Sequence, residues 1–312
     1  MLFIGPSPLA GIGQCTLKYL ELFPGSRYVQ IPELNDELLT DAEVFMFPLP
    51  IEPWLTIIPK VKELSKTVIC MTICETETVH EDYGKLFEMF DTIAVSSEFC
   101  KRVFSKQFPD TSFHIIRAYV PPPVVSSLPP SNIYRFYHIG NVLDQRKNVN
   151  DILRAFIDLK LDNCELVIKA TCKQEVKIEH PAIKVINGLM PQDAIDRIHT
   201  MCDCYVSFSN SEGIGMGAVE AALRDKPVIL PEYGGAPDYI KSDYMISCGT
   251  QEVPRDDFLF KKGMIWGKPN FEQLKEFMLD AYNKKVRKVD HSFTKDRVSA
   301  EEIKSQFKAF PR

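Results

Sequence analysis

Two glutamates, Glu212 and Glu220, lie in a glycine-rich segment with the composition of a ligand-binding turn. The segment spans residues 209–221, SNSEGIGMGAVEA, and follows the apolar run Tyr205–Phe208. Glycine lets the backbone approach a ligand closely, and N–H groups at a helix start bind phosphate or sugar hydroxyls. Carboxylates accept hydrogen bonds from vicinal hydroxyls, so one glutamate can serve a sugar and the other a ribose. The pattern predicts a loop that contains Glu212 and a helix with Glu220 about one and a half turns inside it. The ligand-binding turn is expected to consist of Gly213, Ile214, Gly215 and Met216.

Two cations precede a predicted helix in the same half of the chain. Arg146 and Lys147 follow the predicted strand 134–139 and come directly before an amphipathic stretch. Taken by themselves, they would be typical of an exposed, solvated loop. The sequence contains no Asp-x-Asp motif to hold a metal ion. The family resemblance given below implies a departing diphosphate, whose charge must be neutralised. On that basis we expect Lys147 and Arg146, helped by backbone N–H groups at Gly13 and Gly215, to bind phosphate without a metal cofactor.

Short apolar runs alternate with helical patterns along the chain, which predicts parallel sheets covered by helices. In the first half, strands are predicted at 2–5, 28–31, 44–47, 67–73, 92–95 and 114–119, and a helix at 98–107. In the second half, strands are predicted at 134–139, 165–169, 183–186, 203–208 and 227–230, and helices at 148–159, 191–200, 215–224, 271–283 and 299–310. Five prolines between Val120 and Pro130 indicate an interdomain linker. The expected fold is α/β, with two doubly wound, Rossmann-like domains at 1–125 and 133–312 joined by a linker at 126–132.

The segment around the two glutamates resembles the E-x7-E signature of the retaining glycosyltransferases of family 4, which have the GT-B fold and belong to the group 1 glycosyl transferases. Glu212 and Glu220 occupy its two positions, and KPVI at 226–229 and YGGAPDYI at 233–240 are also similar to that family. The resemblance implies a cleft between two Rossmann-like domains, with the acceptor on the N-terminal side and the nucleotide sugar on the C-terminal side. It also implies retention of anomeric configuration and closure of the cleft by domain rotation.

The resemblance extends over nearly the whole chain, with departures. HIGN at 138–141 and the RKN that follows are similar to the first strand and loop of the family's C-terminal domain, where an arginine and a lysine hold the donor diphosphate. Lys147 matches the lysine. Asn141 stands at the arginine position, so Arg146 is expected to supply the missing charge. His138 is a further candidate for the site.

The first half carries weaker similarities. Residues 11–13 resemble the family's glycine-rich loop near the donor phosphates, which makes Gly13 a donor-binding candidate. TICETE at 72–77 and VSSEF at 95–99 resemble a family subset with W-E-T-D followed by P-S-E-F. Many family members place a histidine near the first of these strand ends. None stands there in this chain, so Glu75 is the candidate for lining the reaction centre. Ser97 is expected to cap the following helix.

The resemblance implies an enzyme that moves a hexose from a donor such as UDP- or GDP-hexose to a glycan, protein or small-molecule acceptor. Glu212, Lys147 and Glu75 are the expected catalytic residues. Three alternatives stay open. One is another GT-B enzyme, such as a phosphorylase or an epimerase. A second is a GT-B scaffold of weak or no activity that binds a nucleotide sugar or glycan, which Asn141 favours. A third is a Rossmann oxidoreductase, which is disfavoured because residues 2–13 lack G-x-G-x-x-G.

Composition limits the remaining function classes. A net charge of −5 gives no electrostatic argument for a nucleic-acid partner, and the KKVRK run at 284–288 is expected to be a solvated helix end. The nine cysteines are expected to be free thiols in a reduced compartment. No run approaches the ~20 apolar residues of a membrane span, and residues 1–8 lack the pattern of a signal peptide. The sequence therefore predicts a cytoplasmic protein without a transmembrane segment.

Overall fold

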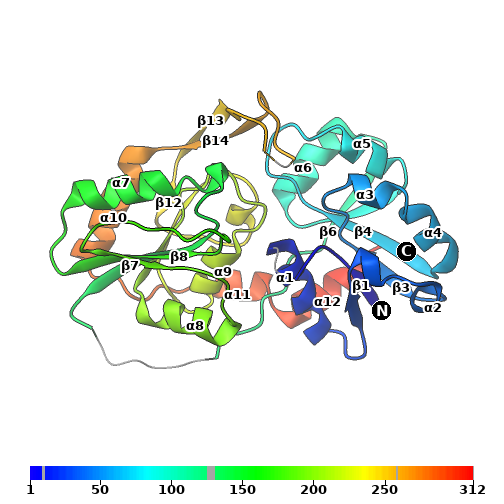
Figure 1. Ribbon diagram of the computed structural model, residues 1–312, viewed down its shortest axis with the longest axis horizontal. Coiled ribbons are helices and arrows are strands. Elements are labelled where there is room, and N and C mark those ends of the chain that lie inside the picture. The colour runs from blue at the N-terminus through cyan, green and yellow to red at the C-terminus, as the bar shows by residue number, and fades with distance from the viewer. Residues whose placement is uncertain (9–10, 125–130, 258, 312) are drawn as a thin grey trace. The chain divides into compact units, whose positions relative to one another are not determined.

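A computed structural model describes the chain in four ranges, residues 1–8, 11–124, 131–257 and 259–311. The chain forms two compact units (Figure 1). The N-terminal unit consists of residues 1–121, 252–266 and 296–312, and the C-terminal unit consists of residues 122–251 and 267–295. The chain therefore passes between the units four times. Each unit has a six-stranded sheet with parallel strand pairs, as the sequence predicts.

The N-terminal sheet has the strand order β2-β1-β3-β4-β5-β6. The elements of this unit are β1 (Leu2–Ile4), α1 (Gly11–Lys18), η1 (Tyr19–Glu21), β2 (Arg27–Val29), η2 (Ile31–Glu33), α2 (Asp36–Leu39), β3 (Glu43–Met46), α3 (Glu52–Leu55), α4 (Ile58–Leu64), β4 (Thr67–Thr72), α5 (Asp82–Phe87), β5 (Thr92–Val95), α6 (Glu98–Gln107), β6 (Ser112–Ile115) and α12 (Ala300–Ala309). The order of connection reverses between β1 and β3. In sheets of this kind, ligands bind beyond the carboxyl ends of the strands at such a switch point.

The C-terminal sheet has the order β12-β11-β10-β7-β8-β9, so its switch point lies between β10 and β7. The elements of this unit are β7 (Tyr134–Gly140), η3 (Gln145–Lys147), α7 (Val149–Leu159), β8 (Cys164–Ala170), β9 (Ile183–Ile186), α8 (Gln192–Met201), β10 (Cys204–Val206), α9 (Met216–Ala222), β11 (Val228–Pro231), η4 (Ala236–Asp238), β12 (Met245–Ile246) and α10 (Phe271–Asn283). Three elements contain the points where the chain changes unit, namely β13 (Cys248–Glu252), β14 (Ile265–Pro269) and α11 (Ser292–Arg297).

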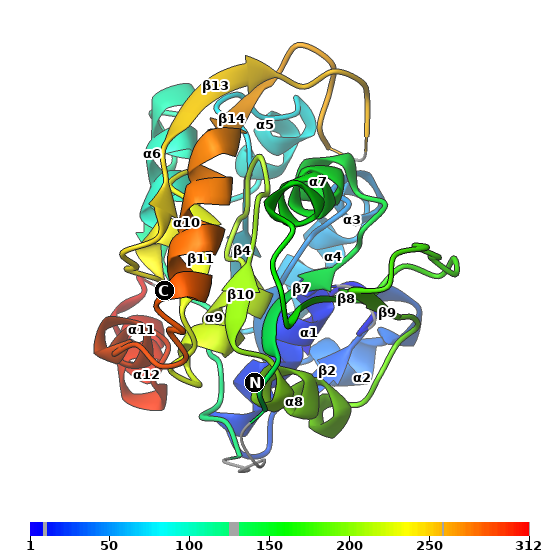
Figure 2. The ribbon, with the colours of Figure 1, turned by 90° about the vertical axis from the view of Figure 1, so that its left-hand side faces the viewer.

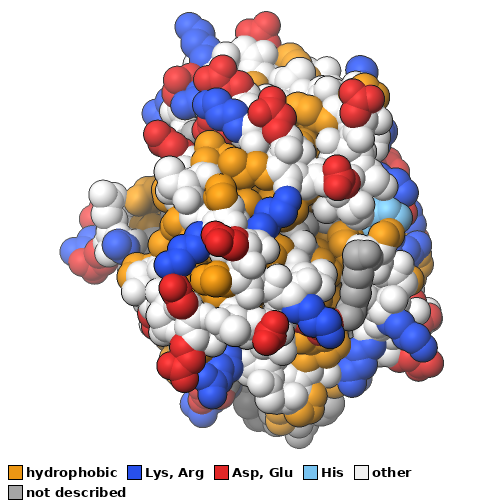
Figure 3. All heavy atoms as spheres, turned by 90° about the vertical axis from the view of Figure 1, so that its right-hand side faces the viewer, with side chains coloured by type: hydrophobic (Ala, Val, Ile, Leu, Met, Phe, Trp, Pro, Cys, Tyr) orange, Lys and Arg blue, Asp and Glu red, His pale blue; other side chains and the backbone are white. Residues whose placement is uncertain are grey.

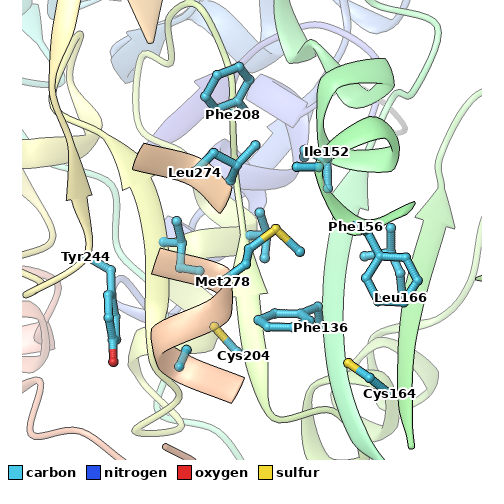
Figure 4. Close-up of a cluster of buried hydrophobic side chains, with 14 of the residues drawn as sticks. Phe136, Ile152, Phe156, Cys164, Leu166, Cys204, Phe208, Tyr244, Leu274 and Met278 are labelled. Atoms are coloured by element: carbon cyan, nitrogen blue, oxygen red, sulfur yellow. The ribbon is translucent and has the colours of Figure 1, made fainter. Parts of the chain in front are cut away.

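Helices α7 and α10 pack on the C-terminal sheet because each has one apolar stripe. In α7 the buried residues Val149, Ile152, Ala155 and Phe156 recur at helical spacing. Figure 2 shows α7 and α10 against the sheet, and Figure 4 shows their side chains meeting Phe136 of β7 and Leu166 of β8. This core fixes the strands whose ends carry the candidate site.

The last helix belongs to the N-terminal unit, which corrects the domain assignment made from the sequence. Phe307 of α12 packs edge-on against four aromatic rings, and the ring centroids of Tyr19, Phe23 and Phe45 lie 5.2, 5.0 and 4.9 Å away. Residues 252–266 also join this unit, and the first change of unit falls at Pro121. The predicted linker at 126–132 lies largely outside the described residues.

Several predicted elements are confirmed. The helix at 98–107, the strands at 92–95 and 183–186 and the helix at 271–283 have the predicted bounds. Ser97 caps α6 by accepting a hydrogen bond from the Cys100 N–H. The strand expected at 114–119 is instead β6, which ends at Ile115, and the strand expected at 28–31 is β2, which ends at Val29 because a 3-10 helix begins at Ile31.

The surface and the thiols agree with ordinary globular composition. Figure 3 shows basic and acidic side chains interspersed on the right-hand side of the molecule in Figure 1, where α2 and α4 lie. None of the nine cysteines, all of which are among the described residues, forms a disulfide. Among the described residues, no helix combines the length and the apolar character needed to cross a bilayer.

Candidate active site

The switch point of the C-terminal sheet brings together two loops that are far apart in the sequence. Strand β7 pairs with β10 in parallel, with Phe136 opposite Cys204 and Tyr137 opposite Tyr205. The carboxyl ends of the two strands therefore lie at one edge of the sheet. The chain after β7 leads into η3, which contains Arg146 and Lys147, and the chain after β10 leads to Glu212.

Glu212 is the centre of a polar cluster at this edge. Its Oε1 lies 2.6 Å from Lys147 Nζ, and its Oε2 lies 3.1 Å from Arg146 Nη1. The Ser209 hydroxyl also donates to Oε1, at 2.6 Å. Arg146 in turn donates to the Ser211 carbonyl and pairs with Asp144, at 2.7 and 3.1 Å. The sequence predicts all three members of the Arg146–Lys147–Glu212 group, but not that they pair with one another.

Burial and charge act in opposite directions on Glu212. Its side chain is only 13% exposed, and burial alone would raise the pKa of the carboxyl. Lys147 and Arg146 outweigh this effect and lower the pKa of Glu212 to about 2. Glu212 is therefore a carboxylate at neutral pH. Because Asp144 pairs with Arg146, two anions and two cations share the cluster.

Asn210 fixes the loop that carries Glu212. Its N–H donates to the Arg146 carbonyl, at 2.8 Å, which ties this loop to the one after β7. Its carbonyl accepts from the Gly267 N–H at 2.9 Å, and its side-chain oxygen accepts from Gln251 at 3.1 Å. Asn210 is buried, so these bonds hold the loop in one conformation. The Glu212 carboxylate is thereby preorganised rather than mobile.

Two glycines meet steric requirements around Glu212. Gly215 is the N-cap residue directly before α9 and has φ of +77°, in the left-handed region that favours glycine. Gly234 has φ of +78°, and a Cβ there would lie 2.6 Å from the Glu212 carbonyl. The neighbouring Gly235 N–H donates to that same carbonyl at 2.7 Å. The loop after β11 therefore packs directly on the backbone of Glu212.

Glu220 lies in α9, as predicted, with its side chain 12% exposed. Its Oε2 is 3.5 Å from Nε2 of His199, a fully buried residue of α8. Burial, Glu212 and Glu220 all raise the pKa of the Tyr205 hydroxyl, so both carboxylates lie near this residue of β10 in the C-terminal unit. Between them in the sequence lie the other predicted donor-binding residues Gly213, Ile214, Gly215 and Met216.

Asn141 and His138 have structural contacts at the end of β7. The Asn141 side chain accepts a hydrogen bond from the Leu143 N–H at 3.2 Å and so closes a turn. His138 is buried, and its Nδ1 lies 2.8 Å from the Val206 carbonyl of β10. Burial lowers the pKa of His138 to about 4, so the ring is neutral and donates from Nδ1.

The candidates from the first half of the chain, Gly13 and Glu75, lie in the N-terminal unit. Gly13 is in the first turn of α1, where a Cβ would collide with the Ser7 carbonyl. Glu75 is half-buried in the loop after β4, and two residues later Glu77 makes a two-armed ion pair with Arg102, both arms at 2.9 Å. These residues are thus in a different unit from Glu212.

Sequence reasoning missed the residues that support the cluster. Ser209, Asn210 and Asp144 hold Glu212 and Arg146 in place, and Tyr137 and His199 lie behind Glu220. Ser209 and Asn210 belong to the glycine-rich segment and could have been found by asking what holds Glu212. The others are brought close only by the sheet order. Among the described residues, no group of three or more His, Cys, Asp or Glu side chains is arranged to hold a metal ion.

Comparison with known proteins relates the segment that contains this site to a protein family. Residues 130–266 match the model of the family described as glycosyl transferases group 1. This stretch is less than half of the chain and contains Lys147, Glu212 and Glu220. No curated protein matches the chain in sequence.

Solved structures resemble the whole chain. The pneumococcal O-GlcNAc transferase GtfA in complex with UDP and GlcNAc is 16% identical, with a TM-score of 0.57 over 87% of this chain and 57% of that chain. An OtsA structure without ligand is 11% identical, with a TM-score of 0.63 over 98% of this chain and 95% of that one. A UDP-forming α,α-trehalose-phosphate synthase from Burkholderia vietnamiensis is 11% identical, with a TM-score of 0.60 over 88% and 70%.

At these identities the likeness concerns the fold. The chain spans less than two thirds of the GtfA/B complex chain and of GtfA, at 58% and 57% of their lengths. The two parallel six-stranded sheets, the switch-point cluster and these neighbours together identify a two-domain α/β protein with the GT-B fold, whose residues 130–266 are similar to the group 1 glycosyl transferases.

Proposed function

We propose that the protein is a glycosyltransferase that moves a hexose from a nucleoside-diphosphate sugar to an acceptor. The observation that carries this proposal is the pairing of Lys147 and Arg146 with Glu212 at the switch point, inside the segment that matches the group 1 glycosyl transferases. A fixed set of cations at this position suits a ligand that leaves as a diphosphate.

Lys147 and Arg146 are proposed to bind the donor diphosphate. An ammonium has three N–H groups, so Lys147 can keep its contact with Glu212 and donate to a phosphate oxygen as well. Asn141 is uncharged at the position where the resembled family has an arginine, and Arg146 is proposed to supply the positive charge instead. In this scheme the charge of the leaving group is neutralised by side chains and backbone N–H groups, and no metal ion takes part.

The two glutamates are proposed to bind different parts of the donor. Glu212 lies beside the cations, so it is assigned to the hydroxyls of the sugar. Glu220 lies on α9 beside His199 and is assigned to the ribose. Glu75 and Gly13 are proposed to line the reaction centre and the phosphates from the N-terminal unit, which is the acceptor side. Retention of anomeric configuration belongs to the same proposal, by analogy with the family that the E-x7-E segment resembles.

Calorimetric titration with UDP, GDP and ADP tests the proposal, followed by turnover assays with the matching nucleotide sugars. We expect one diphosphate to bind, and Lys147→Ala to weaken it by tenfold or more. Lys177→Ala is the matched control, because Lys177 is 77% exposed and lies in the same unit. If none of the three diphosphates binds, the proposal fails.

A second candidate function uses the same fold without turnover. Asn141 closes a turn at the position where the resembled family carries a phosphate-binding arginine. A protein that binds a nucleotide sugar but transfers nothing to water, glycans or small acceptors would be a GT-B scaffold acting as a binding protein. Donor binding with no measurable turnover would favour this reading.

A further inference from the structure

Glu220 has a buried neighbour that the proposed chemistry leaves unused. The imidazole of His199 on α8 is fully buried, and its Nε2 lies 3.5 Å from Glu220 Oε2. On its other side, His199 Nδ1 lies 2.9 Å from the hydroxyl of Tyr137 on β7. Tyr137 is also fully buried, and its ring meets the imidazole edge-on with centroids 5.4 Å apart. The three side chains form a row that ends at the partly exposed carboxylate.

The surroundings determine where the imidazole carries its proton. Burial lowers the pKa of His199, and Glu220 opposes this with a smaller effect. Arg224 and Asp196, the other charged groups that act on the ring, form an ion pair with each other. A neutral imidazole has one N–H. Because Nε2 faces a carboxylate oxygen, the proton belongs on Nε2, and Nδ1 accepts a hydrogen bond from the Tyr137 hydroxyl.

This arrangement restricts Glu220. Among the described residues, His199 Nε2 has no hydrogen-bond partner of ordinary length, and 3.5 Å is the outer limit for such a bond. A buried donor left unsatisfied is costly. The N–H therefore favours rotamers of Glu220 that keep the carboxylate over His199.

We propose that His199, oriented by Tyr137, is a positioning residue that holds the Glu220 carboxylate for the ribose hydroxyls of a nucleoside diphosphate. The proposal rests on the proposed function, since it takes the ribose as the ligand of Glu220. It assigns to α8 and β7 a part in nucleotide selection, although neither His199 nor Tyr137 touches the nucleotide.

The test compares a ribonucleotide with a ligand that lacks the hydroxyls. The full-length chain and its variants are titrated with UDP and with 2′,3′-dideoxy-UDP, or with the GDP or ADP pair if that base binds more tightly. The wild type should bind the ribonucleotide about tenfold more tightly, a preference that Glu220→Gln should abolish. His199→Leu should lower the preference about fivefold or more, and Tyr137→Phe about two- to threefold. His199→Gln, which can place an amide N–H near the former Nε2, should restore part of it.

Thermal unfolding of each variant separates positioning from a loss of structure. His291→Gln is the matched control, because His291 is a buried histidine of the same unit whose Nε2 lies 2.8 Å from the Lys226 carbonyl. It should lower the melting temperature without changing the preference for the ribonucleotide. If Glu220→Gln abolishes the preference but His199→Leu and Tyr137→Phe leave it intact, the positioning role is wrong and the proposed function stands. If the wild type binds none of the diphosphates, both fail together.

Discussion

The two units use similar sheets for different chemistry. Both sheets are parallel, have six strands and contain a switch point. In the C-terminal unit the loops at that point carry Asp144, Arg146, Lys147 and Glu212, which pair with one another. In the N-terminal unit the corresponding strand ends are followed by GPSP at 5–8 and FPLP at 47–50, which contain no ionisable side chain. The topology provides a place for a ligand, and the loop residues determine which charges that place offers.

The units also differ in what completes their cores. In the C-terminal unit, α7 and α10 from that unit's own chain segments cover the site-bearing sheet. In the N-terminal unit, the end of the chain returns as α12 and places Phe307 among aromatic rings of β1, β3 and the segment 19–23. The unit proposed to face the acceptor thus depends on residues at both ends of the sequence.

The largest expected effect is the loss of stability caused by a substitution in α12. Phe307→Ala should lower the free energy of unfolding by about 3–5 kcal/mol, because it removes a buried aromatic ring and leaves a cavity. Urea unfolding measures the loss, and Leu279→Ala is the control because Leu279 of α10 is 39% exposed. Nucleoside-diphosphate affinity should stay within about twofold, since Lys147 and Arg146, the side chains proposed to bind the diphosphate, lie in the other unit. A loss of affinity comparable to that of Lys147→Ala would mean that the two units are not independent in this respect.

Lys147 and Glu212 form an ion pair at the switch point of the C-terminal sheet. Substitutions of these two residues should have different effects on the affinity for the diphosphate. Lys147→Ala removes a cation from the diphosphate and should weaken its binding by roughly 1.5–3 kcal/mol. Glu212→Gln removes the anion that competes for Lys147, so the affinity for the bare diphosphate should be unchanged or higher while turnover falls tenfold or more. Titration with the diphosphate and initial rates with the donor measure both effects. Equal weakening of the diphosphate by the two variants would contradict the assignment of Glu212 to the sugar.

The same ion pair should make the free energy of unfolding depend on pH in the acid range. The pKa of Glu212 is lowered to about 2 in the folded protein, whereas an unfolded-chain glutamate has a pKa of about 4.3. Its contribution to stability is therefore complete above about pH 5 and is lost as the pH falls towards 2. The difference in unfolding free energy between the wild type and Glu212→Gln should shrink by about 2 kcal/mol from pH 6 to pH 3. The exposed Glu179, changed to Gln, should show little change over this range.

The smallest expected effect is that of metal removal. If side chains alone neutralise the diphosphate, turnover in EDTA should stay within about twofold of turnover in buffer with Mg²⁺. Initial rates with and without added Mn²⁺ or Mg²⁺ measure this. A loss of most activity in EDTA that either ion reverses would show that Lys147 and Arg146 are not sufficient.

Local sequence patterns are sufficient to predict several elements and the residue types of the candidate site. Local patterns predicted the bounds of α6, β5, β9 and α10: the two helices bury residues at helical spacing, and the two strands are short, β-branched runs. The turn that contains Glu212 and the helix position of Glu220 also followed from local glycine and apolar patterns. Such features depend on neighbours in the sequence, and they are therefore readable without a tertiary structure.

Which of these residues contact one another depends on the order of the strands and on the packing of the core. Lys147 and Glu212 are 65 residues apart and pair because β10, not β9, lies beside β7. The same strand order brings Tyr137 to His199, 62 residues away. The return of α12 to the N-terminal unit depends on a fit among aromatic rings from distant segments. Sheet order and core packing are long-range properties, since they depend on contacts between segments whose own patterns do not specify their partners.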